Sequence, residues 1–462
     1  MERLTGQCDA TPPWLVEWAR FASNLGFDDL PEAVVERTIQ ILYDSIGAIA
    51  AGAQEPEIQR LTARLTRPDW SGSGGTSPVI GGHLRSTAGV AALLNGIAGT
   101  ALELDEGSQY ARGHPGIHVV PSALAAAHRD RAQGRALIAA VALGYELAAR
   151  AGHAAKMRPA VHAHGTWGTM GAALAVAKLS NASAAQLIEV VNMAASLGLA
   201  TSNRSMTEGG TVRNAFAGWA NQTGLAVWEL AASGFCGEAD ATASVFGQVI
   251  GDGWASETMA EGLGTRWEIT RNYFKMHACC RYVHGALDAL DELEQQIGAR
   301  LDPGSIERIE IETYSFAARL SEPAPRNTLA ARFSVPFAVA TRLVHGTSDI
   351  AAFSEAARTG VAVRALVERT TLLEDPAMTA RQPRERPARV KLDLTDGRTL
   401  SAERSINKGD STDPYSDDEL AGKFLSIVSP IWPEPVAQRI LAMTRAMPEL
   451  TSLDDYCALL AS

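Results

Sequence analysis

The stretch GRALIAAVALGYELAARAGHA, residues 134–154, decides the fold class of this chain. Alanine, glycine and leucine occupy positions on every side of the helix that this stretch predicts, so the helix has almost no face to present to water. The stretch GTWGTMGAALAVAKLS, residues 165–180, has the same character. Helices of this kind are stable only among other helices, so the sequence predicts a helical core.

Further helices are expected on both sides of this core, from about residue 13 to residue 262. In residues 31–53, apolar residues recur at three- and four-residue spacing behind an initial Pro31. Ser86 is a candidate N-cap, and Ser183 with Gln186 matches a capping box.

The spacing of apolar residues changes near residue 300. Ile309, Ile311 and Thr313 alternate with charged neighbours, as do Val390, Leu392 and Leu394. This period of two predicts half-exposed strands, and the Asp-Gly pair at 396–397 predicts a hairpin turn. After about residue 408 the segments 417–428 and 433–447 are again amphipathic, and we expect them to pack on the first helices.

The fold class predicted from these patterns is mainly α. The length favours more than one domain. We predict a large all-helical domain formed by both chain ends, residues 1–270 and 408–462, and a smaller α/β lid domain, residues 271–407.

The composition limits the classes of partner. The chain has 462 residues, with 41 Lys and Arg against 52 Asp and Glu, and a net charge of −11. An acidic protein offers no general basic surface to a phosphate backbone, so we expect no nucleic acid partner. The longest apolar run, residues 136–144, is far shorter than the roughly 20 residues that cross a membrane.

Cysteine usage and the first residues favour a cytoplasmic protein. Five cysteines without a C-x-x-C pair form no disulfide framework, which is typical of a reducing compartment. The opening MERLTGQCDATPPW has no apolar stretch of the kind found in secretory signals. We therefore expect a cytoplasmic location and no membrane association.

The common zinc-protease, serine-hydrolase and P-loop motifs do not occur in the sequence. The glycine-rich segment 71–83 lacks the preceding strand of a dinucleotide-binding fingerprint, so we expect a surface loop there. Candidate chemistry lies instead in four polar clusters set in apolar sequence.

The first cluster is ELDEGSQYARGHPG, residues 103–116. It offers the carboxylates of Glu103 and Asp105 and the hydroxyl of Ser108. The proline after His114 favours an extended backbone, so this ring is expected to project from a loop. The alternative is a surface turn with solvated carboxylates and a histidine that caps the next helix.

The second cluster contains His162 and His164, directly before a predicted helix start whose free N–H groups favour an anion. Gly165, Gly168 and Gly171 recur at three-residue spacing, which lets another backbone approach closely. The alternative is that the glycines serve only helix packing and the histidines are satisfied locally. A metal site on the two histidines would need a clear third ligand, so no metal is predicted.

The third cluster is centred on Arg213, one turn before a buried-looking helix. A guanidinium group at this place can hold a carboxylate through two parallel N–H bonds. The competing interpretation is an arginine that caps the helix or forms an ion pair.

The fourth cluster packs seven polar residues into ten positions: Lys275, His277, Cys279, Cys280, Arg281, Tyr282 and His284. Lys275 is one of only six lysines and has apolar neighbours, which suits its amine to acid/base work. The adjacent cysteines cannot both face one site. A polar hinge at a domain boundary is the alternative.

Taken together and in order, these segments resemble the MmgE/PrpD family, which includes 2-methylcitrate dehydratase, cis-aconitate decarboxylase and iminodisuccinate epimerase. The resemblance covers nearly the whole chain, through PVIGGHLRSTAGVAALLNGIAGTALELDEG, GHPGIHVVPSALA, HAHGTWGTMGAA, VRNAFAGWA, FKMHACCRYVHGALDA and ARFSVPFAVA. It implies a helical domain from both chain ends, an α/β lid, a homodimer and a cleft between the domains.

The resemblance also implies site residues. The family's acidic pair corresponds to Glu103 and Asp105, its two histidines to His114 and His162, and its lid-junction lysine to Lys275. His164 stands where a threonine is frequent in the family, and Arg213 stands where the family has a lysine. Cys280 and Phe337 stand where the decarboxylase-type members have a histidine and a tyrosine. Phe337 has no hydroxyl group, so a mechanism that needs that group does not carry over.

We therefore predict a cofactor-independent lyase that moves a proton next to a carboxylate of a small di- or tricarboxylate, in a dehydration or a decarboxylation. Its catalytic residues would be His114, His162 and Lys275 as proton carriers, with Glu103 or Asp105 orienting an imidazole. Its substrate-binding residues would be Arg213, His164, Ser108, Cys280, Arg281, His284 and Phe337. Two alternatives stay open, an epimerase of an imino- or amino-dicarboxylate and a catalytically inactive carboxylate-binding homologue.

Overall fold

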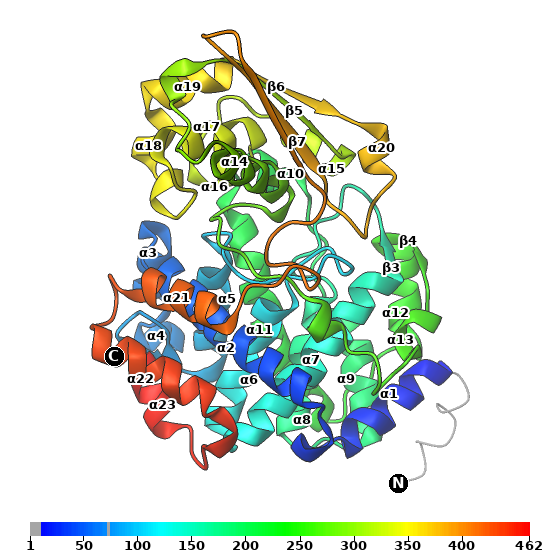
Figure 1. The fold of residues 1–462 in the computed structure, drawn as a ribbon. Coiled ribbons are helices and arrows are strands. Elements are labelled where there is room, and N and C mark those ends of the chain that lie inside the picture. The colour runs from blue at the N-terminus through cyan, green and yellow to red at the C-terminus, as the bar shows by residue number, and fades with distance from the viewer. Residues whose placement is uncertain (1–10, 72–73) are drawn as a thin grey trace.

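The computed structural model describes residues 11–71 and 74–462 (Figure 1). Cys8 and most of the opening segment lie outside these residues. The helical part of the molecule contains α1 (Pro13–Asn24), α2 (Glu32–Gly52), α3 (Pro56–Leu65), α5 (Ala88–Thr100), α6 (Pro115–Arg129), α7 (Gly134–Ala154), α8 (Gly168–Leu179), α9 (Ala184–Ser196) and α11 (Ala215–Ala232). The mainly α class is confirmed.

Helix α7 is the buried helix that its sequence predicts. Residues 137–152 are buried without interruption. A Cβ atom at Gly144 would lie 2.6 Å from the carbonyl oxygen of Gly171 in α8, and one at Gly171 would lie 2.5 Å from that of Gly144. Real side chains do not approach so closely, so glycine on both helices sets their spacing.

The C-terminal helices return to the first ones, as expected. In Figure 1, α21 (Asp417–Val428) lies beside α2, with α22 (Glu434–Arg445) and α23 (Asp454–Leu460) next to it. The buried Lys423 Nζ of α21 donates to Asp44 Oδ1 of α2 at 2.6 Å. A buried ion pair therefore links a helix near the C-terminus to a helix near the N-terminus.

A four-stranded sheet and its helices form the opposite end of the molecule (Figure 1). The strands are β5 (Ile306–Thr313), β6 (Thr370–Glu374), β7 (Ala388–Leu394) and β8 (Thr399–Arg404), in the order β6-β5-β7-β8. Only β5 and β6 are parallel. Contacts with the sheet come from α14 (His284–Ile297), α17 (Val335–His345) and α19 (Val361–Glu368).

The predicted strand pattern is confirmed in this sheet. Ile309 and Ile311 are fully buried while their charged neighbours are partly exposed. Strands β7 and β8 form the predicted antiparallel hairpin, and Gly397 in its turn has a φ of +85°. Such a φ favours glycine, which explains the Asp-Gly pair.

Two short β pairs correct the expectation of an all-helical domain. Strands β1 (Ser77–Val79) and β2 (Leu84–Ser86) form a hairpin where we expected a loop, because the Asn95 side chain bonds Pro78 O and Ile80 N and holds the first strand in the core. Strands β3 (Ala155–Met157) and β4 (Gly251–Trp254) form the second pair.

The two predicted caps have different outcomes. Ser183 and Gln186 form the expected capping box at the start of α9. Ser86 does not cap α5, because it ends β2 and Thr87 occupies the N-cap position without a side-chain bond. No helix within residues 11–71 and 74–462 combines the length and the apolar character needed to cross a membrane.

Candidate active site

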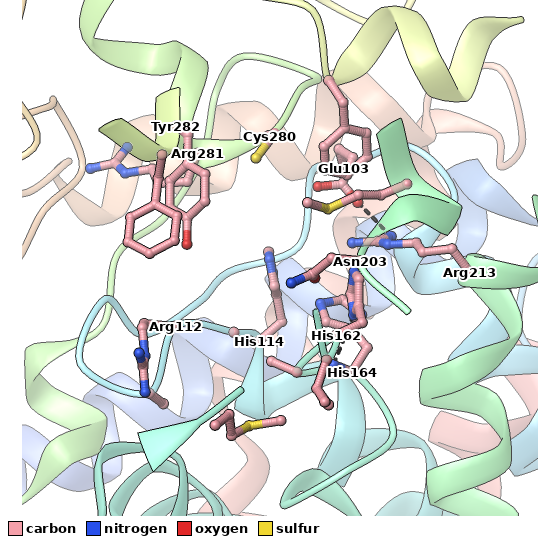
Figure 2. Close-up of a pocket in the computed structure, with 18 of the residues that line it drawn as sticks. Glu103, Arg112, His114, His162, His164, Asn203, Arg213, Cys280, Arg281 and Tyr282 are labelled. Atoms are coloured by element: carbon pink, nitrogen blue, oxygen red, sulfur yellow. Dashed lines mark hydrogen bonds and ion pairs between the residues drawn. The ribbon is translucent and has the colours of Figure 1, made fainter. Parts of the chain in front are cut away.

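A cavity of about 210 Å³ is lined by residues from segments far apart in the sequence (Figure 2). Seven of the predicted site residues line it: Glu103, His114, His162, His164, Arg213, Cys280 and Arg281. The other predicted residues, which are Asp105, Ser108, Lys275, His284 and Phe337, are buried and lie outside the lining.

Four imidazole rings gather at one wall of the cavity. The ring of His164 lies between the others, with centroid distances of 4.9 Å to His114, 4.8 Å to His162 and 5.0 Å to His118. Burial, with help from the positive charge of Arg213, holds the pKa values of His162 and His164 well below the ordinary range. Both rings are therefore neutral at physiological pH.

Two oxygen atoms determine which ring nitrogen of His114 carries a hydrogen. His114 Nδ1 lies 2.7 Å from the backbone oxygen of Glu106 and 2.9 Å from Asp105 Oδ2. A carbonyl and a carboxylate can only accept, so Nδ1 carries the hydrogen. In the neutral ring, Nε2 is then a free base.

His162 has the opposite tautomer. Its Nδ1 accepts the backbone N–H of His164 at 3.0 Å. Because the ring is neutral and Nδ1 is an acceptor, its hydrogen lies on Nε2. When the His114 ring is neutral, the two histidines therefore present to one cavity a lone pair on His114 and an N–H donor on His162.

The His118 ring forms hydrogen bonds with the backbone of both segments that carry the other three histidines. Its Nδ1 donates to the backbone oxygen of His114 at 2.7 Å, and its Nε2 accepts the N–H of Gly165 at 3.0 Å. A Cβ atom at Gly168 would lie 2.4 Å from the His118 ring, so this glycine makes room for it. Since the Gly165 N–H is used by His118, it is not free to hold the anion that we expected at this helix start.

The two predicted carboxylates are held by two cations. Glu103 has a left-handed backbone with a φ of +55°, and its Oε1 lies 2.5 Å from Arg213 Nη1. Lys275 Nζ lies 3.7 Å from Glu103 Oε2 and 3.8 Å from Asp105 Oδ1. Burial would raise the pKa of Asp105, but His114 and Lys275 outweigh it and keep this carboxylate ionised.

Lys275 lies beside the carboxylates. Its side chain is completely buried and is not part of the cavity lining. It faces Glu103 and Asp105, and its role as a proton carrier stays a prediction. For Arg213, the ion-paired interpretation describes the structure, although this residue also lines the cavity and its Nε has no hydrogen-bond partner.

Three predicted binding residues contact protein groups instead of the cavity. Ser108 Oγ accepts the N–H of Ala111 at 3.2 Å, and the His284 ring bonds Arg281 Nη1 and Cys279 O. Phe337 packs against Phe353, with ring centroids 5.9 Å apart. All three are buried outside the cavity lining, and their part in binding a substrate stays a prediction.

Cys280 lines the cavity as a thiol. Burial raises its pKa to about 11, and burial also raises the pKa of Cys279 well above its ordinary value. Neither cysteine is therefore a ready nucleophile at neutral pH.

Further lining residues were missed in the sequence. They include Arg112, Asn203, Tyr273, Phe333 and Arg386. Tyr282, which belongs to the fourth polar cluster but was not among the predicted site residues, also lines the cavity. Arg112 is two residues from His114 and could have been found by proximity. Arg386 lies in the proline-rich stretch of residues 374–389, and no local pattern marks it.

The loop that carries the acidic residues is anchored to four helices, which are α2, α6, α7 and α21. Asp44 Oδ2 accepts the N–H of Glu106 at 2.9 Å, and Lys423 Nζ donates to Leu104 O at 2.7 Å. Glu106 Oε1 accepts the N–H of Gly116, and its Oε2 accepts the hydroxyl of Tyr145. Burial raises the pKa of Glu106 to about 8.

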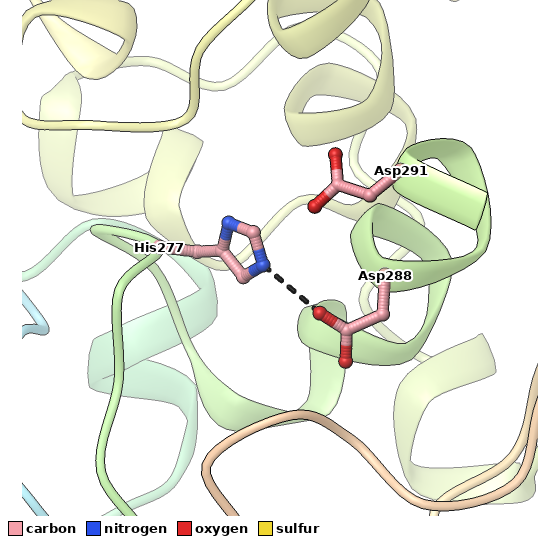
Figure 3. A group of neighbouring side chains, drawn as sticks. All are labelled: His277, Asp288 and Asp291. Atoms are coloured by element: carbon pink, nitrogen blue, oxygen red, sulfur yellow. Dashed lines mark hydrogen bonds and ion pairs between the residues drawn. The ribbon is translucent and has the colours of Figure 1, made fainter. Parts of the chain in front are cut away.

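A separate group of His277, Asp288 and Asp291 brings ligand-type atoms within 4.8 Å of one another (Figure 3). His277 Nε2 lies 3.1 Å from Asp288 Oδ1, and Arg342 Nη2 donates to Asp291 Oδ1 at 2.7 Å. The backbone N–H of Lys408 donates a hydrogen bond to Asp288 Oδ2 at 3.0 Å. Protein donors thus satisfy these carboxylates, and we draw no metal site from them.

Comparison with known proteins agrees with this arrangement. Residues 16–252 match the MmgE/PrpD N-terminal domain and residues 277–449 the MmgE/PrpD C-terminal domain. A cis-aconitate decarboxylase of Aspergillus terreus is 26% identical over 383 residues, which cover 77% of this chain and 76% of that protein. The cis-aconitate decarboxylase-like protein oryM of Aspergillus oryzae is 25% identical over 494 aligned residues, with 98% of each chain covered. This chain therefore belongs to the MmgE/PrpD family.

Proposed function

We propose that this protein is a cofactor-independent lyase that acts on a small di- or tricarboxylate. It removes a proton next to a carboxylate and releases carbon dioxide or water. The observation that carries the proposal is the pair of opposite tautomers on His114 and His162 at one cavity. The decarboxylases among its relatives support the same class of reaction.

His114 acts as the base in the first step. Its Nε2 takes the proton from the carbon next to the substrate carboxylate, and the electrons of that C–H bond move into the carboxylate as an enolate-like species. Asp105, 2.9 Å from Nδ1, stabilises the imidazolium that forms. Because Asp105 is ionised, it supplies this negative charge without changing its own protonation.

His162 acts as the acid in the second step. In a dehydration its Nε2–H donates to the departing hydroxyl group. In a decarboxylation it protonates the carbon that keeps the electron pair of the broken C–C bond, and the His114 imidazolium returns its proton to the enolate-like carbon. Arg213, which is buried in the cavity wall, stabilises negative charge on the substrate. Lys275 Nζ lies within 4 Å of both carboxylates and favours the ionised form of Asp105.

The test is a screen of small di- and tricarboxylates, including cis-aconitate and 2-methylcitrate, in deuterated water with mass spectrometry as the readout. The wild type should release carbon dioxide or water from one of them. His114→Ala and His162→Ala should each lower kcat by about 100-fold or more, since each removes a proton carrier. His345→Ala is the matched control, because His345 is exposed at the end of α17, and it should keep full activity.

Two results would contradict the lyase proposal. Deuterium incorporation without unsaturation or gas release would identify an epimerase, which the placement of an acid and a base on separate segments also permits. Tight binding of carboxylates with no exchange and no turnover would identify an inactive homologue. The melting temperatures of the variants should stay within a few degrees of wild type, and a collapse of the fold would assign the histidines a structural role instead.

A further inference from the structure

Two guanidinium groups are buried at the cavity without a carboxylate partner. Arg281 is 2% exposed and Arg386 is 7% exposed, and both line the cavity. Arg281 donates to the backbone oxygens of Asn407 and Lys408, at 3.1 and 2.9 Å, while its Nε has no hydrogen-bond partner. Arg386 Nη1 likewise has none, and neither arginine forms an ion pair within the part of the chain that the structure describes.

Aromatic rings cover these two cations. The Cζ atom of Arg386 lies 5.3 Å from the ring centroids of both Tyr273 and Tyr282, and that of Arg281 lies 4.6 Å from the ring of Tyr273. Contact with aromatic rings stabilises a guanidinium group. Arg386 also has a side-chain hydrogen bond with Tyr273. Arg281 Nε and Arg386 Nη1 have no partner and can donate to a ligand. The tyrosines therefore orient the arginines but do not neutralise them.

Two other buried arginines of this protein are neutralised, because Arg150 pairs with Glu146 at 2.7 Å and Arg213 pairs with Glu103. A third, Arg332, has no ion pair in the described residues, but its Nη1 donates to the backbone oxygens of Leu102 and Ala278. Buried like charges without a counter-ion are unfavourable, and a bound anion removes that cost. Arg281 and Arg386 thus form a pair of cations at the cavity, and neither has an ion pair with a carboxylate of the described residues.

Arg281 lies apart from Arg213 in the cavity, and Arg386 contacts the same Tyr273 ring as Arg281. In Figure 2, Arg281 and Tyr282 are on one side of His114, while Glu103 and Arg213 are on the other. A ligand whose reacting carbon lies at the histidines can therefore reach the arginine pair only with a distant group.

We propose that Arg386 and Arg281 bind a second carboxylate of the substrate, at the end remote from the carbon that reacts. The inference rests on the proposed function for the position of the reacting carbon, and it names the side chains that hold the other end of that substrate. Monocarboxylates are poor ligands, and a di- or tricarboxylate is held at both ends. Arg386 contributes its free Nη1, and Arg281 contributes its free Nε.

Binding of unreactive anions to the full-length protein tests the proposal by calorimetry. Succinate and tricarballylate are the polycarboxylate probes, and butyrate is the monocarboxylate with as many carbons as succinate. Wild type should bind succinate about tenfold or more tightly than butyrate. Arg386→Met should weaken succinate binding about tenfold while changing butyrate binding less than about twofold. Arg398→Met, which alters an exposed arginine paired with Asp396, is the control and should change neither.

A thermal readout separates binding from structure. Without ligand, Arg386→Met should melt no lower than wild type, because it removes an unpaired buried charge, and succinate should no longer raise its melting temperature. If this variant does not fold, Arg386→Lys should fold and should still show weakened succinate binding, since one ammonium cannot replace a planar guanidinium group.

Three outcomes would overturn the inference. These are equal binding of succinate by wild type and the Arg386 variants, equal loss of succinate and butyrate binding, and failure of wild type to bind either polycarboxylate. Failure of the proposed function looks different, because wild type would bind succinate through Arg386 and yet turn over no member of the screen.

Discussion

At the scale of single residues, the account depends on where two protons lie. Asp105 and the backbone of Glu106 fix the hydrogen of His114 on Nδ1, and the backbone of His164 fixes that of His162 on Nε2. The sequence predicted that an acidic residue would orient an imidazole. It did not distinguish Glu103 from Asp105, because only one residue separates them and only the folded structure shows which carboxylate contacts the ring.

Asp105→Asn tests this contact. An asparagine can turn its NH₂ group toward His114 and favour the wrong tautomer, so kcat should fall by about 100- to 10,000-fold with a small change in KM. Steady-state kinetics on the substrate found in the screen measures the effect. A loss of less than about fivefold would show that Asp105 does not set the state of His114.

Phe337→Tyr tests the departure from the family at that position. Because Phe337 lies outside the cavity and packs on Phe353, the added hydroxyl should leave kcat/KM and the range of substrates unchanged. A buried hydroxyl without a partner should lower the free energy of unfolding by about 1–3 kcal/mol, as measured by urea denaturation. A changed range of substrates would show that the residue reaches the ligand.

At the scale of elements, the features that could be predicted are those that repeat locally. The apolar sides of α7 and the alternation in β5 and β7 follow from neighbouring residues alone. The hairpin of β1 and β2 could not be predicted in this way, because the Asn95 side chain in a later helix holds it. The anchoring of the acidic loop also depends on distant helices, and Glu106 shows the effect most clearly.

Glu106→Gln should remove a pH dependence from stability. Because burial raises the pKa of Glu106 to about 8, the folded protein keeps a proton that the unfolded chain releases above its ordinary pKa of 4.5. This contribution to stability is complete below pH 4.5 and is lost as the pH rises through 8. The free energy of unfolding of wild type minus that of Glu106→Gln should therefore fall between those values in a urea series. A constant difference would mean that Glu106 is ionised in the folded protein.

At the scale of the whole molecule, the cavity exists because remote segments converge. The sequence identified His114 and His162 as site residues, and they do share one cavity. It did not reveal that Lys275 faces the carboxylates or that Arg386 lines the wall, because both facts depend on how the sheet end meets the helical end. The division into two domains and the homodimer remain predictions.

Lys423→Met tests the link between the chain ends. Removing this cation leaves Asp44 buried without its partner and frees Leu104 O, so the free energy of unfolding should fall by about 3–5 kcal/mol. The double variant with Asp44→Asn should recover part of that loss, because no unpaired charge remains. A stability equal to wild type for the single variant would show that α21 does not anchor the loop.

The central claim is that His114 and His162 carry their hydrogens on opposite ring nitrogens. Long-range ¹H–¹⁵N NMR on protein labelled with ¹⁵N in histidine, with His114→Ala and His162→Ala for assignment, observes this directly at pH 7. The account predicts a protonated Nδ1 on His114, and a neutral His162 with its hydrogen on Nε2. A charged His162, or a hydrogen on its Nδ1, would contradict it.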